Sequence, residues 1–351
     1  GVDEYQDSLR CTAASAGNDH RLGANEAPPA IVSAFLGKTM TDVLRKLLEL
    51  PSDTPIEIAG KRGKSLGLVE IPEIFVDNTD RNRTSPFAFT GNRFEFRAVG
   101  SSANCAGAIT TINSAVAEQL LEFKKAVDKE LESGKAQNVA IMDALKPIIA
   151  SIIDVICFDG NGYSEEWHQE AKRRGLDVET SVPEMISAFT TKESVEMFSR
   201  VGVYTEKELE ARNEVKWETY SKKIQIEARV IGRMAINHII PTALDYQKKL
   251  LENIALMKQV FPDAYEQQAE TEISMVKQIS SLCSDLRKCV DSMIEMRKQA
   301  NVITSEYEKA RAYHQIAESL FGIRNLVDTL EEIVDNDMWP LPKYRELLFI
   351  N

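Results

Sequence analysis

Residues 91–97 read Gly91-Asn92-Arg93-Phe94-Glu95-Phe96-Arg97, in which charged and aromatic side chains alternate. Because successive side chains of a β-strand point to opposite faces, this period of two predicts a short strand. One face would carry Arg93, Glu95 and Arg97, and the other would carry Phe94 and Phe96. We expect the aromatic face to anchor the strand in a core and the charged face to be available for chemistry.

The charged face combines one carboxylate with two guanidinium groups. Glu95 could bind a metal ion while its neighbours hold anionic groups. A second arginine-rich run, Arg81-Asn82-Arg83-Thr84-Ser85, lies twelve residues upstream. Because Arg binds phosphate oxygens through paired donors, this concentration suggests phosphate chemistry. On the strand pattern alone, a charged face that alternates with Phe is more typical of the solvated side of an antiparallel strand.

The composition is that of a globular protein without a membrane span. The chain has 351 residues, of which 43% are hydrophobic and 27% charged. No uncharged apolar run approaches the length of a transmembrane helix, and the net charge of -12 argues against a nucleic-acid-binding surface. The five cysteines are scattered without CxxC spacing, which indicates neither a disulfide framework nor a zinc site and favours a reducing cytoplasm.

The order of patterns along the chain predicts an α+β fold. Residues 1–105 hold short apolar runs between Gly, Pro, Asn and Thr, which indicates strands and loops, with one helix near residues 42–50. From Asn104 onward the apolar spacing becomes helical. The first amphipathic helix would end at Gly134 and has this apolar stripe: Val116, Leu120, Phe123, Val127 and Leu131.

Longer helices are predicted in the rest of the chain. Thr205-Glu206-Lys207-Glu208 has the form of a capping box and predicts a helix that Pro241 interrupts. Two apolar seams with three- and four-residue steps follow, each too short to indicate a coiled coil, so we expect helix-on-helix packing within one subunit. The seams are Val276, Ile279, Cys283, Leu286, Val290 and Met293, and then Ile316, Leu320, Ile323, Val327, Leu330 and Val334.

Two segments that look like known motifs do not support a site. Residues 60–65 end like a phosphate-binding P-loop, but Ile58 stands where its first glycine belongs, which favours a basic turn. Residues 159–164 are similar to a calcium loop, but Ser164 stands at a position that requires glycine. We expect a turn that leads into a helix carrying Trp167. The four histidines show no metal-ligand spacing.

Several separated segments resemble glutamine synthetase, specifically the C-terminal half of its long type III form. In sequence order they are residues 16–29 (AGNDHRLGANEAPP), Asn82-Arg83-Thr84, residues 94–97, Ser102-Ala103-Asn104 and residues 339–346 (WPLPKYRE). The resemblance implies that residues 1–135 are the C-terminal part of the catalytic α/β domain, with antiparallel strands and flanking helices. Residues 136–351 would be a helical region specific to type III.

The same resemblance implies a function. The family ligates glutamate and ammonia to glutamine at the expense of ATP, through a γ-glutamyl phosphate, with Mg²⁺ or Mn²⁺ as the metal. It implies a homo-oligomer of stacked rings, with a dodecamer as the expected number, and sites between neighbouring subunits. Phosphoryl transfer to a carboxylate brings two anions together, so an arginine-rich site suits this reaction.

Three residues outside the strand receive roles by position in the resemblance. Arg21 would receive substrate glutamate, and Glu26 would be the flap carboxylate that closes over the site and helps to deprotonate ammonium. Arg83 would meet the transferred γ-phosphate. A carboxylate that takes a proton from the attacking amine is the expected general base.

On the strand, the resemblance makes Glu95 a ligand of the metal ions, Arg97 a contact to glutamate and its acyl phosphate, and Arg93 a contact to ATP phosphates. Two departures limit the match. Ala88 stands where the common bacterial form has a second phosphate-binding arginine, and an insertion near residues 38–70 separates the flap from Arg83. The family's earlier metal ligands and adenine-binding loops have no counterpart here, so we expect a longer natural polypeptide and no synthetase activity from this segment alone.

Two other interpretations remain open. An acidic helical chain could be a non-catalytic assembly scaffold, or the chain could belong to a related ligase that joins glutamate to another amine. The joint presence of Arg21, Glu26, Arg83, Glu95 and Arg97 favours a ligase over a scaffold. Between ammonia and another amine, only the type III signature discriminates.

Overall fold

The computed structural model describes residues 1–19, 29–53, 63–64, 74–75, 83–97, 100 and 103–348. The chain forms two compact units, Gly1–Lys216 and Trp217–Asn351. The resemblance predicted a boundary between a catalytic domain and a helical region at residues 135 and 136. That boundary stays a prediction. No helix in the described ranges has both the length and the apolar character needed to cross a membrane.

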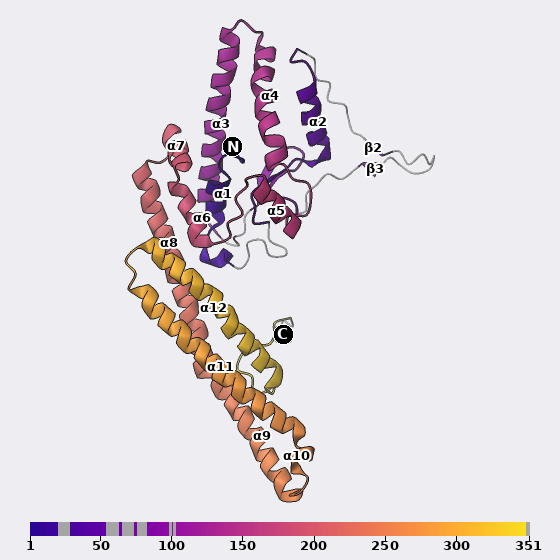
Figure 1. Ribbon diagram of the computed structural model, residues 1–351, viewed down its shortest axis with the longest axis vertical. Helices are drawn as coiled ribbons and strands as arrows, with labels where there is room; N and C mark the ends of the chain where they lie inside the picture. Colours follow the sequence, from indigo (N-terminus) through magenta and orange to yellow (C-terminus); the bar gives the residue numbers. More distant parts are fainter. Residues whose placement is uncertain are drawn as a thin grey trace. The chain divides into compact units, whose positions relative to one another are not determined.

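The first unit is mostly helical and contains the strands (Figure 1). Its elements are α1 (Gln6–Ala13), η1 (Ala16–Asn18), β1 (Ala34–Phe35), α2 (Gly37–Glu49), β2 (Gly63–Lys64), β3 (Ile74–Phe75), β4 (Phe87–Phe89), β5 (Phe94–Phe96), α3 (Ala106–Glu132), α4 (Gln137–Ile156), α5 (Glu165–Arg173), α6 (Val182–Ser187), η2 (Ala188–Thr190) and α7 (Lys192–Arg200). The helix predicted near residues 42–50 is confirmed as α2.

The strands of the first unit form one small mixed sheet and one separate pair. The sheet has the order β1-β4-β5, with β1 parallel to β4 and β4 antiparallel to β5. The pair β2 and β3 is antiparallel. The end of α4 is joined to this sheet, because the Phe158 amide donates to the carbonyl of Ala34 at 3.0 Å. A mainly helical chain with a small sheet confirms the α+β class.

The helix α3 confirms the predicted element but presents a different face to its neighbours. It ends just before Gly134, whose φ of +87° suits glycine at a helix end. In the predicted apolar stripe, however, Val116 and Leu120 are 51% and 61% exposed. The buried positions are Thr111, Ser114, Ala115 and Glu118. Three of these four side chains are small, and α3 packs against α4, α1 and α7, so the stripe prediction was wrong about which face packs.

The loop at residues 159–164 is the predicted turn into a helix. The Tyr163 amide donates to Oδ1 of Asn161 at 3.1 Å, and Ser164 caps α5 by accepting from the Trp167 amide at 3.2 Å. Trp167 is 2% exposed and stacks on Phe158, with ring centroids 3.6 Å apart. The cap therefore aims a large aromatic side chain into the core of the first unit.

A long helix, α8 (Glu206–Met234), begins in the first unit and continues into the second. The predicted capping box is confirmed, because the Thr205 amide donates to Oε2 of Glu208 at 2.8 Å and the Glu208 amide donates to Oγ1 of Thr205 at 3.4 Å. We predicted that Pro241 interrupts the helix, but the chain stays helical through this position. A π-helical turn, η3 (Ala235–Ile239), places Pro241 in the first turn of α9 (Ile240–Val260), where a helix needs no amide proton.

The second unit is a bundle whose helices run side by side (Figure 1). After α9 it contains α10 (Tyr265–Gln268), α11 (Glu270–Asn301), α12 (Glu306–Ile333) and α13 (Tyr344–Leu348). The two predicted seams lie on α11 and α12, which pack against each other. Ile279, Leu286, Val290, Ile316 and Ile323 are fully buried, so the prediction of packing within one subunit is confirmed.

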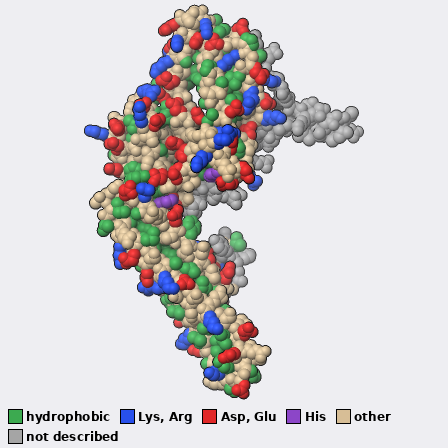
Figure 2. All heavy atoms as spheres, in the orientation of Figure 1, with side chains coloured by type: hydrophobic (Ala, Val, Ile, Leu, Met, Phe, Trp, Pro, Cys, Tyr) green, Lys and Arg blue, Asp and Glu red, His purple; other side chains and the backbone are tan. Residues whose placement is uncertain are grey.

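The outer faces of the helices carry both signs of charge. Figure 2 shows acidic and basic side chains interspersed over the visible face. Many are paired one helical turn apart, as in Lys222–Glu218 at 2.6 Å and Arg324–Asp328 at 2.7 Å. The acidity of the chain is therefore spread over a solvated helical surface.

Candidate functional site

The predicted strand at residues 91–97 exists as β5, the second strand of a hairpin. The Thr90 amide donates to the carbonyl of Arg93 at 2.9 Å and closes the turn, in which Gly91 has a φ of +98°. A positive φ is readily adopted only by glycine, so Gly91 permits this turn. The Arg97 amide donates to the carbonyl of Pro86 at 2.6 Å and extends the ladder beyond β5.

The charged face of β5 forms an ion-pair group. Nε and Nη2 of Arg93 donate to the same oxygen of Glu95, Oε1, at 3.1 and 2.9 Å. Nη2 of Arg97 donates to the other oxygen, Oε2, at 3.3 Å. Hydrogen bonds from Arg93 and then Arg97 hold the pKa of Glu95 below its usual range. Glu95 is therefore an ionised carboxylate between two guanidinium groups.

The three side chains of this face differ in exposure. The side chain of Arg93 is 69% exposed, that of Glu95 34% and that of Arg97 15%. An incoming anion would meet Arg93 first and Arg97 only deeper in the site. The arrangement can thus bind anionic groups at two depths on either side of one carboxylate.

The aromatic face of β5 packs on the aromatic residues of β4. The ring of Phe94 lies 5.2 Å from those of Phe87 and Phe89, and Phe96 lies 6.3 Å from Phe87, between centroids. Phe94 is nevertheless 49% exposed. We expected this face to be anchored in a core, and for Phe94 this was wrong. β5 is an edge strand of the sheet, so only the neighbouring strand β4 covers that ring.

Ala88 pairs directly with Glu95 across the ladder, so the two side chains share one face of the sheet. Ala88 is fully buried. Ala88 stands where the common bacterial form of the family would have an arginine. This position therefore lies beside Glu95, the predicted metal-binding carboxylate. An alanine there leaves Arg93 and Arg97 as the cations that contact Glu95 in the described ranges.

The structure brings together three of the six predicted site residues. Arg83 precedes β4, its side chain is exposed, and within the described ranges it makes no ion pair to Glu95. Its carbonyl accepts a hydrogen bond from the Gly162 amide at 2.7 Å, which fixes the backbone beside the loop at residues 159–164. Arg21 and Glu26 lie outside the described residues, so their roles stay predictions.

The carboxylate of Glu95 fits a divalent metal as a partial site. It is ionised, partly exposed and an oxygen donor, which is what Mg²⁺ and Mn²⁺ prefer. One carboxylate supplies only one or two ligands. In the part of the chain that the structure describes, no group of three or more His, Cys, Asp or Glu side chains is placed to hold a metal ion.

Comparison with known proteins shows what the chain is similar to. Residues 140–258 match the family described as the glutamine synthetase C-terminal domain. The full chain is 49% identical over 351 residues to a glutamine synthetase of Bacteroides fragilis (strain YCH46), with 99% of this chain and 48% of that protein covered. The chain is similar to glutamine synthetases. The resemblance seen in the sequence is thereby confirmed.

Other glutamine synthetases show the same relationship. The chain is 35% identical over 351 residues to the type-3 glutamine synthetase of Dictyostelium discoideum and 33% identical over 360 residues to a glutamine synthetase of Butyrivibrio fibrisolvens. These alignments cover 99% of this chain but 47% and 48% of the two relatives. The chain thus spans about half the length of the curated glutamine synthetases that it matches.

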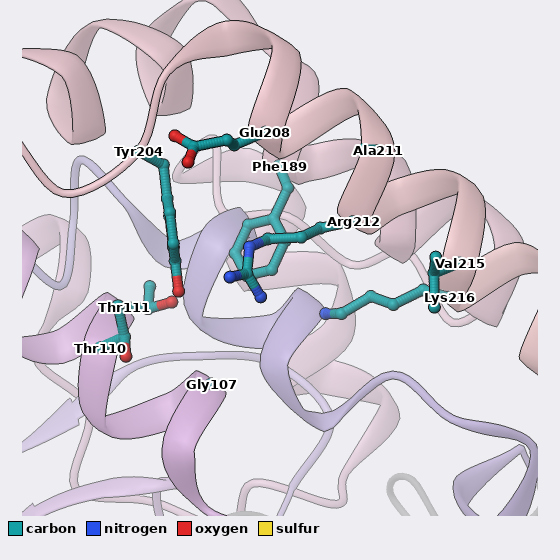
Figure 3. Close-up of a pocket in the computed structure, with 10 residues that line it drawn as sticks. All are labelled: Gly107, Thr110, Thr111, Phe189, Tyr204, Glu208, Ala211, Arg212, Val215 and Lys216. Carbon is teal, nitrogen blue, oxygen red and sulfur yellow. The ribbon is translucent and has the colours of Figure 1, made fainter.

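Sequence reasoning missed a second group of polar residues, which line a pocket in the first unit (Figure 3). Arg212 and Lys216 belong to it and lie on α8. A signal was present, because Glu208, Arg212 and Lys216 recur every four residues and so share one helix face, with Tyr204 just before the helix. Only the structure shows that this face lies opposite the start of α3.

Proposed function

We propose that this chain is the C-terminal part of an ATP-dependent glutamate–ammonia ligase and that the charged face of β5 belongs to its active site. The observation that carries the proposal is the Arg93–Glu95–Arg97 group in a relative of glutamine synthetases. In this reaction ATP phosphorylates the γ-carboxylate of glutamate, and ammonia then displaces the phosphate. Fixed cations beside the transferring group lower the cost of bringing these anions together.

The exposures on β5 suggest a division of roles. Arg93, which is largely exposed, would contact the phosphates of ATP. Arg97, which is mostly buried and held through its amide by Pro86, would contact glutamate and its acyl phosphate. Glu95 would be a ligand of Mg²⁺ or Mn²⁺, and the bound metal would supply positive charge to neutralise the phosphates.

The remaining predicted residues complete the proposal. Arg21 would receive glutamate, Glu26 would close over the site and accept a proton from ammonium, and Arg83 would meet the transferred phosphate. Because Glu95 alone cannot complete a metal site, we infer that further metal and nucleotide ligands come from other residues of the full-length protein. Residues 1–135 would then belong to the catalytic domain and residues 136–351 to a type III helical region.

The assembly is proposed to be a cytoplasmic homo-oligomer of stacked rings, with a dodecamer as the number that the family resemblance favours. The seams of α11 and α12 are buried against each other, so they are not available for contacts with another subunit. An apolar face on α3 is available instead, with Ile109, Val116 and Leu120 each more than half exposed. We infer that a second copy of the chain covers this face.

The test of the ligase proposal compares two carboxylates that are each held by two arginines. Glu170 is bonded by Arg173 and Arg174, both at 2.7 Å, but lies on α5 and is not one of the predicted site residues. In the full-length protein, Glu95→Gln should lower kcat for glutamine synthesis by at least about 100-fold, because even outer-shell residues of metal sites cost 10- to 100-fold. Glu170→Gln should retain activity.

Three outcomes distinguish the competing interpretations. Unchanged activity in Glu95→Gln would end the proposed metal-binding role. Equal losses in both variants would point to a general effect on folding. A higher kcat/KM for an alkylamine than for ammonium would favour the related ligase, and no ligase activity in the natural protein would favour the scaffold.

A further inference from the structure

A pocket of about 510 Å³ lies in the first unit, between the start of α3 and one face of α8 (Figure 3). All the residues that line it belong to residues 1–216. It contains none of the residues that the proposed ligase site uses. Its volume is within the range of about 300–1,000 Å³ that small-molecule sites occupy.

Two cations lie against aromatic rings in this pocket. The guanidinium carbon of Arg212 is 4.4 Å from the centroid of Tyr204, and Nζ of Lys216 is 4.2 Å from that of Phe189. Ring faces hold cations in place without using up their hydrogen-bond donors. Within the described ranges, Arg212 makes no ion pair, and Lys216 donates only to the carbonyl and Sγ of Cys11, at 3.2 and 3.4 Å.

A buried hydroxyl without a partner also lines the pocket. Thr111 is 1% exposed, and its Oγ1 has no hydrogen-bond partner among the residues that the structure describes. A buried polar atom left unpaired costs about 1–3 kcal/mol, so such an atom at a pocket wall indicates a missing partner. Figure 3 shows Thr111 and Thr110 on the α3 side of the pocket, with Arg212 and Lys216 reaching in from α8.

The pocket also holds one ionised carboxylate, Glu208, which the two cations Arg212 and Lys216 outnumber. Hydrogen bonds from Thr205 and the charge of Arg212 lower the pKa of Glu208. The carboxylate of Glu208 is occupied by the amide and the hydroxyl of Thr205, at 2.8 and 2.9 Å, as part of the capping box. Gly107, in the first turn of α3, faces open space, since a Cβ built on it would meet no atom within 4 Å. The positive end of α3 therefore borders the pocket without a side chain in between.

We propose that this pocket binds a small organic anion with an aromatic body. Arg212, Lys216 and the hydroxyl of Thr111 would hold its phosphate or carboxylate group. Phe189 and Tyr204, with the aliphatic wall that Ala211 and Val215 provide, would contact its apolar body. The site is separate from the charged face of β5, so it does not depend on the proposed ligase activity.

The experiment measures binding of defined probes to the full-length protein by isothermal titration calorimetry. Phenyl phosphate and benzoate carry both features of the ligand, inorganic phosphate carries the charge alone and phenol the ring alone. We expect both aromatic anions to bind in a saturable way and at least tenfold more tightly than inorganic phosphate or phenol.

Four variants locate the binding. Arg212→Gln should weaken binding of phenyl phosphate at least about tenfold, since it removes a charge-assisted contact. Thr111→Val should weaken it about three- to tenfold and should fold well, because the hydroxyl it removes has no partner. Lys207→Gln removes the same charge from an exposed position on α8 and should have no effect. Arg93→Gln, on the proposed ligase site, should also leave this binding intact.

The proposal fails under any of several results. These are no saturable binding of either aromatic anion, equal affinity for inorganic phosphate, or equal weakening by Lys207→Gln and Arg212→Gln. Loss of binding in Arg93→Gln with retention in Arg212→Gln would assign the site to β5 and would also overturn it. Circular dichroism of each variant separates loss of binding from loss of folding.

Discussion

Arg93 and Glu95, two residues apart on β5, are joined by two hydrogen bonds to a single carboxylate oxygen, at 3.1 and 2.9 Å. Arg97 occupies the other oxygen at 3.3 Å. A strand alone places these three side chains on one face, but it does not decide that the carboxylate lies between the guanidinium groups. The two guanidinium groups lower the pKa of Glu95 and occupy both of its oxygens, so a metal ion bound there would share or displace these hydrogen bonds.

The pKa of Glu95 should rise when either arginine is removed. The larger rise is expected for Arg93→Gln and the smaller for Arg97→Gln, because the hydrogen bond from Arg93 contributes most to the present lowering. An NMR titration of the Glu95 side-chain carbonyl measures the shift in each variant. Arg83→Gln, which removes an arginine that makes no ion pair with Glu95, is the control and should leave the titration unchanged. Equal titration curves of Glu95 in all variants would contradict its pairing with Arg93 and Arg97.

Gly162→Ala should destabilise the first unit. A Cβ at this position would lie 2.5 Å from Cγ of Pro29 and 2.7 Å from the carbonyl oxygen of Thr84. Overpacking of this kind costs about 1–3 kcal/mol of unfolding free energy. Gly107→Ala is the matched control, because it meets no neighbour and should stabilise α3 by up to about 1 kcal/mol. Urea unfolding monitored by circular dichroism measures the free energy of unfolding of both variants. A loss of stability in Gly107→Ala, or none in Gly162→Ala, would contradict this prediction.

Arg200→Met should destabilise the packing of α7 on α3. Arg200 forms a salt bridge with Glu118, whose side chain is only 1% exposed. Removing the partner of a buried charge costs about 3–5 kcal/mol, and less here because Arg200 is half exposed, so we expect about 1–3 kcal/mol. The double variant Glu118→Met with Arg200→Met should recover most of the loss. A double variant less stable than Arg200→Met alone would disprove an ion-pair origin.

Cys105 and Cys157 should react with alkylating reagents at different rates, and the rate at Cys157 should depend strongly on pH. Burial and the nearby carboxylates of Asp159 and Asp154 raise the pKa of the Cys157 thiol to about 11, so little thiolate exists at pH 8. Cys105 is exposed. Iodoacetamide at pH 8 should therefore modify Cys105 well before Cys157, and the rate at Cys157 should increase about tenfold per pH unit up to its pKa. Peptide mapping by mass spectrometry gives both rates, and faster labelling of Cys157 at pH 8 would refute the assignment.

The exposed apolar face of α3 should matter for assembly. Val116→Lys combined with Leu120→Lys should reduce the oligomer of the full-length protein, because charges at 51% and 61% exposed apolar positions oppose burial by another subunit. Asn113→Lys combined with Gln137→Lys adds the same charge at exposed polar positions and serves as the control. Light scattering measures the mass of each. A full-size oligomer in the first variant would remove α3 from the interface.

Local patterns predicted the elements well and their surroundings less well. The capping box at Thr205, the stop at Gly134 and the turn before Trp167 depend on residues within one or two turns of one another, and all three formed as expected. The stripe on α3 failed, because apolar spacing identifies a helix face but not its partner. In the structure α3 packs against α4, α1 and α7, and its buried positions include the small residues Thr111, Ser114 and Ala115.

The sequence by itself determined the β5 alternation, the α+β class, the helical seams and the relationship to glutamine synthetases. These depend on periodicity and on residue identity, which a single chain records directly. Only the tertiary structure decided that Glu95 is held between two arginines, that Ala88 adjoins it, and that Arg212 and Lys216 share a pocket with Thr111. Such relationships join residues that are far apart along the chain or set side-chain directions, and they arise only when packing brings separate elements together.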